Sequence, residues 1–115
     1  MKNLKNKIGY CDNKDLGINK NGGHYVYIRK VNNNGTCDVN VITSLEDKNK
    51  NFNLNKLSQV KKGNTYPIPK YDANFKLWSG VTRKSIKDVK TDRIIDIGKK
   101  GIKKRHFFFI GKFFK

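Results

Sequence analysis

The sequence has little cysteine, and the two residues it has, Cys11 and Cys37, are too few for a disulfide framework. The two histidines are His24 and His106. Neither they nor the cysteines are spaced as the Cys-x-x-Cys or His-x-x-x-His pairs that zinc sites use. We therefore expect free thiols, no metal site and no cofactor.

Long apolar runs are also missing. The longest, residues 106–110, is far shorter than the roughly 20 residues that a membrane-spanning helix needs. No apolar stretch follows the basic start of the chain, so the pattern does not predict a signal peptide. These features predict a cytoplasmic protein without a membrane partner.

Acidic residues are scarce: nine Asp and Glu stand against 26 Lys and Arg, which gives a formal net charge of +17. The charge is uneven, because residues 1–47 carry +2 and residues 48–115 carry +15. A field of this sign favours polyanions, so RNA or single-stranded nucleic acid is the expected partner. The alternative is a compositional bias toward Lys and Asn, under which the charge has no partner.

The clearest pattern that is present predicts a β-hairpin over residues 22–44. Apolar and polar residues alternate with period two along residues 22–31 and again along 37–44, which is typical of half-buried strands. The intervening Asn-Asn-Asn-Gly, residues 32–35, suits a tight turn because Asn and Gly tolerate positive φ. His24 and the pair Thr43-Ser44 then lie at the rim of a β core.

The rest of the chain predicts a single domain, residues 1–115, that is mainly β with one or two short helices. The expected fold is a small, partly open β-barrel. The expected elements are a short strand around Ile8 and Tyr10, a strand at 52–57, an extended edge segment or loop at 65–71, a strand at 81–89, a helix at 91–98 and a last strand within 106–115.

Two strings in the hairpin, Gly-Gly-His-Tyr-Val-Tyr-Ile-Arg-Lys (22–30) and Val-Asn-Val-Ile-Thr-Ser (39–44), resemble the start of the PemK/MazF-like toxins of toxin–antitoxin systems. Residues 76–86 and the segment to Gly98 are similar to the family's later strand and C-terminal helix, so the resemblance covers about residues 8–98. It implies an SH3-like β-barrel and metal-independent cleavage of single-stranded RNA, usually by a homodimer that an antitoxin neutralises.

The family's catalytic pair is an Arg at the head of the first hairpin strand and a Thr or Ser after the second. Thr43 and Ser44 match the second element, whereas His24 stands where Arg-Pro is usual. A histidine can act as general acid or base near neutral pH, but it does not give the permanent bidentate clamp of Arg. The resemblance therefore implies His24, Thr43 and Ser44 as catalytic residues, with a cation elsewhere for the phosphate. The expected nucleic-acid-binding residues are Arg29, Arg83, Lys84, Lys99, Lys100, Lys103, Lys104 and Arg105.

Two other functions stay open from the sequence. One is a non-catalytic module of a phage, plasmid or other mobile element that binds nucleic acid or a protein through its basic face. The other is an inhibitor protein. Under either, His24 is a half-exposed rim residue, Thr43 and Ser44 cap a turn, and the basic residues form a solvated face. The nuclease requires the rim groups to converge, and the binding module requires the basic groups to line one groove.

Overall fold

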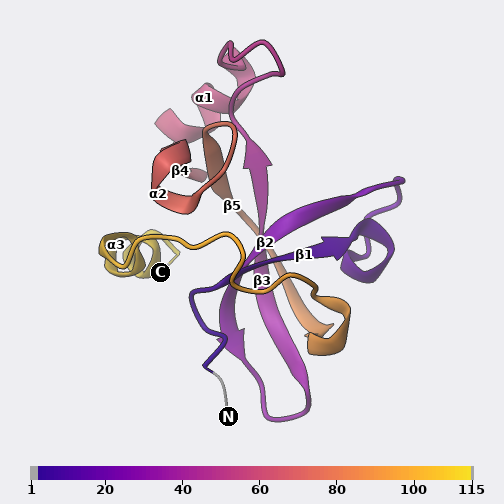
Figure 1. Ribbon diagram of the computed structural model, residues 1–115. Helices are drawn as coiled ribbons and strands as arrows, with labels where there is room; N and C mark the ends of the chain where they lie inside the picture. Colours follow the sequence, from indigo (N-terminus) through magenta and orange to yellow (C-terminus); the bar gives the residue numbers. More distant parts are fainter. Residues whose placement is uncertain (1–2, 115) are drawn as a thin grey trace.

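The computed structural model describes residues 3–114 and contains a five-stranded antiparallel sheet in the order β1-β2-β3-β5-β4 (Figure 1). This confirms a mainly β protein. The strands are β1 (Ile8–Asp12), β2 (Gly23–Val31), β3 (Thr36–Ser44), β4 (Thr65–Ile68) and β5 (Ser79–Lys90). The helices are α1 (Leu54–Lys61), α2 (Lys70–Ala73) and α3 (Arg105–Phe113), with 3₁₀ turns η1 (Asn13–Leu16) and η2 (Thr91–Arg93).

The predicted hairpin is confirmed as β2 and β3, which pair with Val26 opposite Val41 and Ile28 opposite Val39. Gly35 closes the turn at a φ of 78°, a conformation that costs glycine little. The expectation of half-buried strands is wrong for the centre of β2, because Val26, Tyr27 and Ile28 are all buried. Neighbouring side chains point to opposite faces, so the sheet is covered on both sides there.

Two apolar clusters account for this double burial. Tyr27 and Ile42 belong to the first, together with Ile110 of α3. The second contains Val26, Ile28 and Val39 on the opposite side of the same two strands, packed with residues of β1, η1 and the end of β5. The hairpin is thus the central layer of the molecule, and its two ends are positioned by packing on both faces.

Three of the element predictions are wrong. The segment 52–57 was expected to be a strand, but α1 begins at Leu54, where Asn53 Oδ1 accepts a hydrogen bond from the Lys56 amide at 3.1 Å. The segment 91–98 was expected to be a helix. It forms only the 3₁₀ turn η2, then an isolated bridge from Ile95 to Tyr10 of β1, and then a bend and turn over residues 96–98.

The C-terminal segment was expected to be a strand and is instead the helix α3. His106 and Ile110 are buried four residues apart, which is the spacing of one helix face. The last residue of the predicted strand, Lys115, lies outside the described residues. Among residues 3–114 no helix has the length and apolar character needed to cross a membrane.

The predicted edge segment 65–71 is confirmed over residues 65–68, which form β4, pair with β5 and carry Pro67 opposite Gly80. Its last two residues, Lys70 and Tyr71, belong instead to the helix α2. Gly80 is required by close packing, since a Cβ at this position would collide with the side chain of Thr65. On its other side Gly80 pairs with Thr43, and the next residue, Ser79, pairs with Ser44. The end of β3 is therefore held between tightly packed neighbours.

A buried carboxylate attaches α3 to the rest of the fold. Asp72 of α2 accepts hydrogen bonds from Arg105 Nη2 at 2.5 Å and from His106 Nε2 at 2.7 Å, and Lys103 Nζ lies 3.3 Å from its other oxygen. On its other side, His106 Nδ1 lies 2.8 Å from the Tyr66 hydroxyl of β4. Side chains from α2, β4 and α3 are thereby joined in one polar network.

We expect the attachment of α3 to weaken in acid. The hydrogen bond from Arg105, as the largest cause, and the one from His106, as the second, hold the pKa of Asp72 well below its ordinary value. A carboxylate with a lowered folded-state pKa contributes its full stability above the unfolded pKa of about 3.9 and loses it as pH falls further. The free energy of unfolding, measured with urea at about pH 7 and about pH 3, should fall less in Asp72→Asn than in the wild type. Asp92→Asn changes an exposed carboxylate, so its free energy of unfolding should fall as much as that of the wild type. An equal fall in the wild type and both variants would contradict the role assigned to Asp72.

Candidate functional site

A cavity of about 480 Å³ opens at the end of the hairpin and contains three of the residues predicted for function. His24 comes from the start of β2, Thr43 from the end of β3 and Lys84 from β5. Lys20, from the loop before β2, and Lys56 of α1 also line the cavity. Figure 1 shows α1 beyond the end of β3. The cavity is thus assembled from segments that lie far apart in the sequence.

The ring of His24 is held by one buried side chain. Asn13 of η1 donates its amide hydrogen to the Asn21 carbonyl at 3.2 Å, so its Oδ1 is free to accept. That oxygen lies 2.6 Å from His24 Nδ1, and Asn13 is buried. An acceptor at this distance places the ring hydrogen on Nδ1. The other nitrogen, Nε2, therefore keeps its lone pair and can take up a proton.

The electrostatics of the cavity favour this neutral form. Partial burial, followed by the charges of Lys84, Lys56 and Lys20, lowers the pKa of His24 from its ordinary value. A neutral imidazole surrounded by ammonium groups is a base placed where an anion would be attracted. The arrangement suits proton transfer beside a phosphate group.

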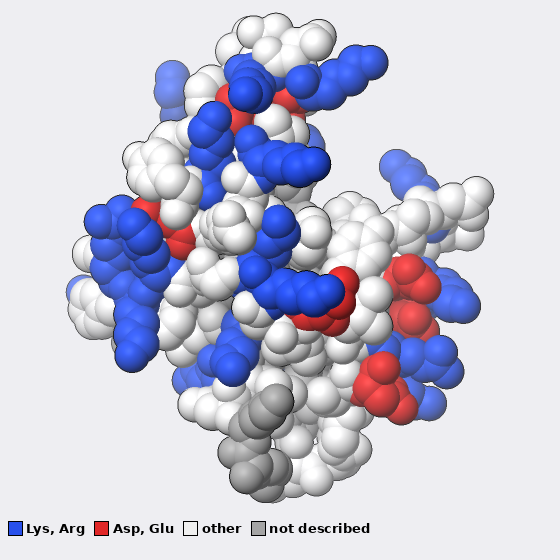
Figure 2. All heavy atoms as spheres, viewed as in Figure 1, with Lys and Arg blue, Asp and Glu red and all other residues white. Residues whose placement is uncertain are grey.

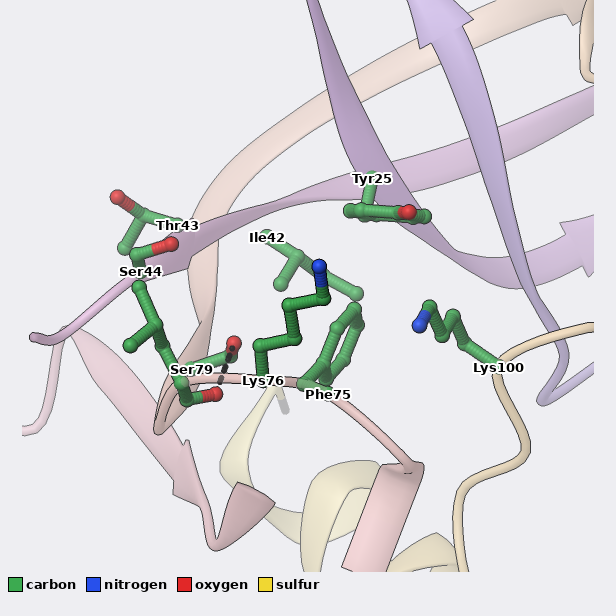
Figure 3. A pocket seen from close by; sticks show the side chains of 9 residues that line it. Tyr25, Ile42, Thr43, Ser44, Phe75, Lys76, Ser79 and Lys100 are labelled. Carbon is green, nitrogen blue, oxygen red and sulfur yellow. Dashed lines mark hydrogen bonds between the residues drawn. The ribbon is translucent and has the colours of Figure 1, made fainter. Parts of the chain in front are cut away.

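Thr43 and Ser44 do not act at the same place, although the sequence treats them as one pair. Both come from the end of β3, where successive side chains point to opposite faces. Of the two, only Thr43 lines the His24 cavity, while Ser44 lines a second cavity on the other side, which Thr43 also borders. Figure 3 shows the hydroxyls of Thr43 and Ser44 pointing in different directions. The Ser44 carbonyl accepts a hydrogen bond from Lys56 Nζ at 2.7 Å, which ties α1 to this strand end.

The two arginines expected to bind the phosphate lie outside the His24 cavity. Arg29 donates from Nη2 to the Ser85 hydroxyl at 2.9 Å and lines a different cavity, beside Tyr27 and α3. Arg83 donates from Nε to the Gly63 carbonyl at 2.9 Å and lies 4.9 Å from the ring centroid of Phe113. Both have structural contacts on the side of the sheet that α3 covers.

Most of the basic run near the C-terminus is engaged within the protein. Lys99 pairs with Asp96 at 3.1 Å, Lys100 donates to the Asn74 carbonyl at 2.9 Å, and Lys103 and Arg105 contact Asp72. Lys104 precedes α3 and is exposed. Figure 2 shows basic side chains spread over the side with α1, α2 and α3, while the acidic ones gather mainly on the side of η1 and η2. The basic run is therefore in part an anchor for α3.

Three residues of the site were not predicted: Lys20, Lys56 and Asn13. Lys20 and Lys56 lie in two separate segments, and each stands between asparagine or leucine residues, as other lysines of the chain do. Asn13 lies in the polar stretch before the hairpin, and nothing in the sequence pairs it with His24, eleven residues later. These contacts depend on how η1 and α1 pack on the sheet, which local patterns do not encode.

Within residues 3–114, no group of three or more His, Cys, Asp or Glu side chains is arranged as a metal site. The polar side chains that line the cavity are those of His24, three threonines, Gln59 and three lysines. The sequence matches no protein-family model, and a search of curated proteins finds no match.

Proposed function

We propose that the protein is a metal-independent endoribonuclease of the PemK/MazF-like type that cleaves single-stranded RNA. The observation that carries the proposal is the pairing of His24 with Asn13 inside a cavity that also holds Thr43 and Lys84. A base, a hydroxyl and several ammonium groups are the components that RNA cleavage by its own 2′-hydroxyl requires.

The architecture supports the SH3-like barrel that this proposal includes. One apolar cluster lies inside the curved sheet, where residues of β1, β2, β3 and the end of β5 meet. After β5 the chain returns to β1, and Tyr10 and Ile95 exchange two backbone hydrogen bonds of 2.8 Å. This bridge joins β1 to the segment that follows β5, as in a partly open barrel, while the other edge strand, β4, pairs with β5 and leaves the sheet unclosed.

In the proposed reaction, the 2′-oxygen of a ribose attacks the adjacent phosphorus, and its proton passes to His24 Nε2. The bond from phosphorus to the 5′-oxygen breaks, leaving a 2′,3′-cyclic phosphate on one product and a 5′-hydroxyl on the other. The leaving oxygen takes its proton from a lysine ammonium of the cavity. Lys20, Lys56 and Lys84 offset the charge that develops on the phosphate, and Thr43 donates a hydrogen bond to it. From the sequence, this role was expected of Lys84 together with Arg29 and Arg83.

The test is incubation of the purified protein with a labelled single-stranded RNA in EDTA, followed by analysis of the product ends. We expect the RNA to be cleaved into products that carry 2′,3′-cyclic phosphate ends. Intact RNA together with tight, salt-sensitive binding would contradict it and favour the non-catalytic binding module. Intact RNA without binding would also contradict it and point to a protein partner.

Lys84→Ala should lower kcat/KM for RNA cleavage on the order of 100-fold, because it removes a cation that stabilises the transition state. Lys87→Ala is the matched control, since it removes an equal charge from an exposed position of the same strand outside the cavity. The control should stay within a few-fold of the wild type. If both variants lose activity equally, the effect is one of net charge and the placement of Lys84 is wrong.

A further inference from the structure

The cavity that Ser44 lines combines aromatic rings, lysines and a hydroxyl, and it plays no part in the proposed proton transfer. Its volume is about 300 Å³. Tyr25 comes from β2 and Ser44 from β3, Phe75 and Lys76 come from the loop between α2 and β5, and Lys100 precedes α3. All five side chains are seen around the cavity in Figure 3. It carries no acidic side chain among the described residues that line it.

Two aromatic rings form a firm wall of this cavity. The ring centroids of Tyr25 and Phe75 lie 5.1 Å apart at 70°, and Tyr10 packs on Tyr25 at 5.3 Å in the same edge-to-face manner. Both Tyr25 and Phe75 are partly buried against the apolar cluster beneath α3. Their positions are therefore fixed before a ligand arrives, while part of each ring stays accessible.

Two ammonium groups lie beside these rings. Lys100 Nζ is 5.7 Å from the Phe75 ring centroid and is held there by its hydrogen bond to the Asn74 carbonyl. Figure 3 shows the Lys76 amine directed toward Tyr25 and the Lys100 amine pointing into the cavity from the other side. The Ser44 hydroxyl is directed inward as well. Rings that can stack on a base and cations that can bind a phosphate are thus combined in one small space.

The cavity also adjoins the His24 site. Thr43 lines both cavities, so only the end of β3 separates them. We propose that it binds a neighbouring nucleotide of the same single-stranded RNA, with the base against Phe75 and Tyr25 and a phosphate on Lys76 and Lys100. That the bound strand is RNA rests on the proposed function. Proteins bind single-stranded nucleic acid in this way: unpaired bases stack on aromatic side chains, and cations contact the phosphate backbone.

The experiment measures equilibrium binding of a fluorescent 2′-O-methyl oligoribonucleotide, which lacks the attacking hydroxyl and cannot be cleaved. Phe75→Leu keeps an apolar side chain in the core and removes the aromatic face. We expect it to raise the dissociation constant about tenfold, as the loss of one base stack does. Circular dichroism and thermal unfolding of the variant establish that it is folded.

The cations are tested by Lys76→Ala combined with Lys100→Ala. Each single-strand phosphate that is neutralised adds about 0.7 to the magnitude of the slope of log affinity against log salt concentration. Loss of the one phosphate held by Lys76 and Lys100 should therefore reduce that magnitude by about 0.7. Lys87→Ala combined with Lys90→Ala removes the same charge from exposed positions of β5 outside this cavity and should leave the slope close to that of the wild type.

Cleavage of an unmodified RNA by the wild type is measured in parallel, so that the two proposals fail separately. Weaker binding by Phe75→Leu and by the Lys76/Lys100 variant supports the nucleotide site, even where the wild type leaves RNA intact. Binding by both variants that equals that of the wild type overturns it, whether or not RNA is cleaved. An equal loss of slope in the Lys87/Lys90 control also overturns it, because the effect is then one of total charge.

Discussion

Replacing His24 with alanine is expected to lower kcat/KM for RNA cleavage by about 10²- to 10⁴-fold, which is the usual contribution of a general base. The affinity for an uncleavable RNA should change little, because the lysines of the cavity remain. His24→Asn is the sharper variant, since its side-chain amide can still donate a hydrogen bond toward Asn13 but offers no basic nitrogen. It should be as inactive as His24→Ala. Activity retained in both variants would rule out His24 as the base.

The dependence of kcat/KM on pH gives an independent check on the same residue. Because neutral His24 is the active form, activity should be complete above its pKa and fall as pH drops through it. That pKa is lowered by burial and by the three lysines, so the acid limb should lie below the ordinary histidine value of about 6.5. In Lys84→Ala one of these causes is removed, and the acid limb should move to higher pH. An unmoved limb would mean that another group titrates.

Ile110→Ala should cost about 2–5 kcal/mol of the free energy of unfolding, out of the 5–15 kcal/mol typical of a domain. Ile110 is 1% exposed and packs in the apolar cluster that joins α3 to the sheet, so the truncation leaves a cavity. Phe109 precedes it on the same helix and is 55% exposed. Phe109→Ala should therefore change stability by about 0.5 kcal/mol or less.

Urea unfolding of the two variants measures the difference. It also distinguishes the helix from the strand that the sequence favoured. In a strand Phe107 and Phe109 share one face, and the alternate residues 108 and 110 share the other. In the helix Ile110 lies with His106 on the buried face. A larger loss for Phe109→Ala than for Ile110→Ala would contradict the placement of α3.

The hairpin was predictable because its signals are local. Residues 22–44 alternate with period two on both sides of an Asn-Gly turn, and pairing follows from that alternation. The C-terminal helix was not predictable in this way. Four apolar residues in succession, 107–110, have no period, and the residue that attaches the helix, Asp72, lies 34 positions before His106. A contact at that separation is determined by the packed fold and not by the segment.

The period-two alternation of side chains along the strands already indicated which of the candidate site residues share a face of the sheet. In β2, His24 falls with Val26 and Ile28, and Arg29 falls with Tyr25 and Tyr27, so the two could not share one face near the site. The same parity separates Thr43 from Ser44, and Arg83 from Lys84. His24 and Thr43 were identified because they lie at the ends of the two hairpin strands, and Lys84 because it is a basic residue of the predicted strand 81–89. Lys20 and Lys56 reach the cavity from a loop and a helix that the pattern does not place.

The strand β4 has a consequence for how the molecule meets other chains. It is an outer strand of the sheet, and an outer strand offers its free backbone groups to any extended segment that approaches. Here Pro67 lies within the strand and Pro69 directly follows it, and neither has an amide hydrogen to give. A foreign strand would therefore find too few donors to continue the ladder. A lysine-rich protein with several exposed phenylalanines is in this way protected from growing into fibres along that side.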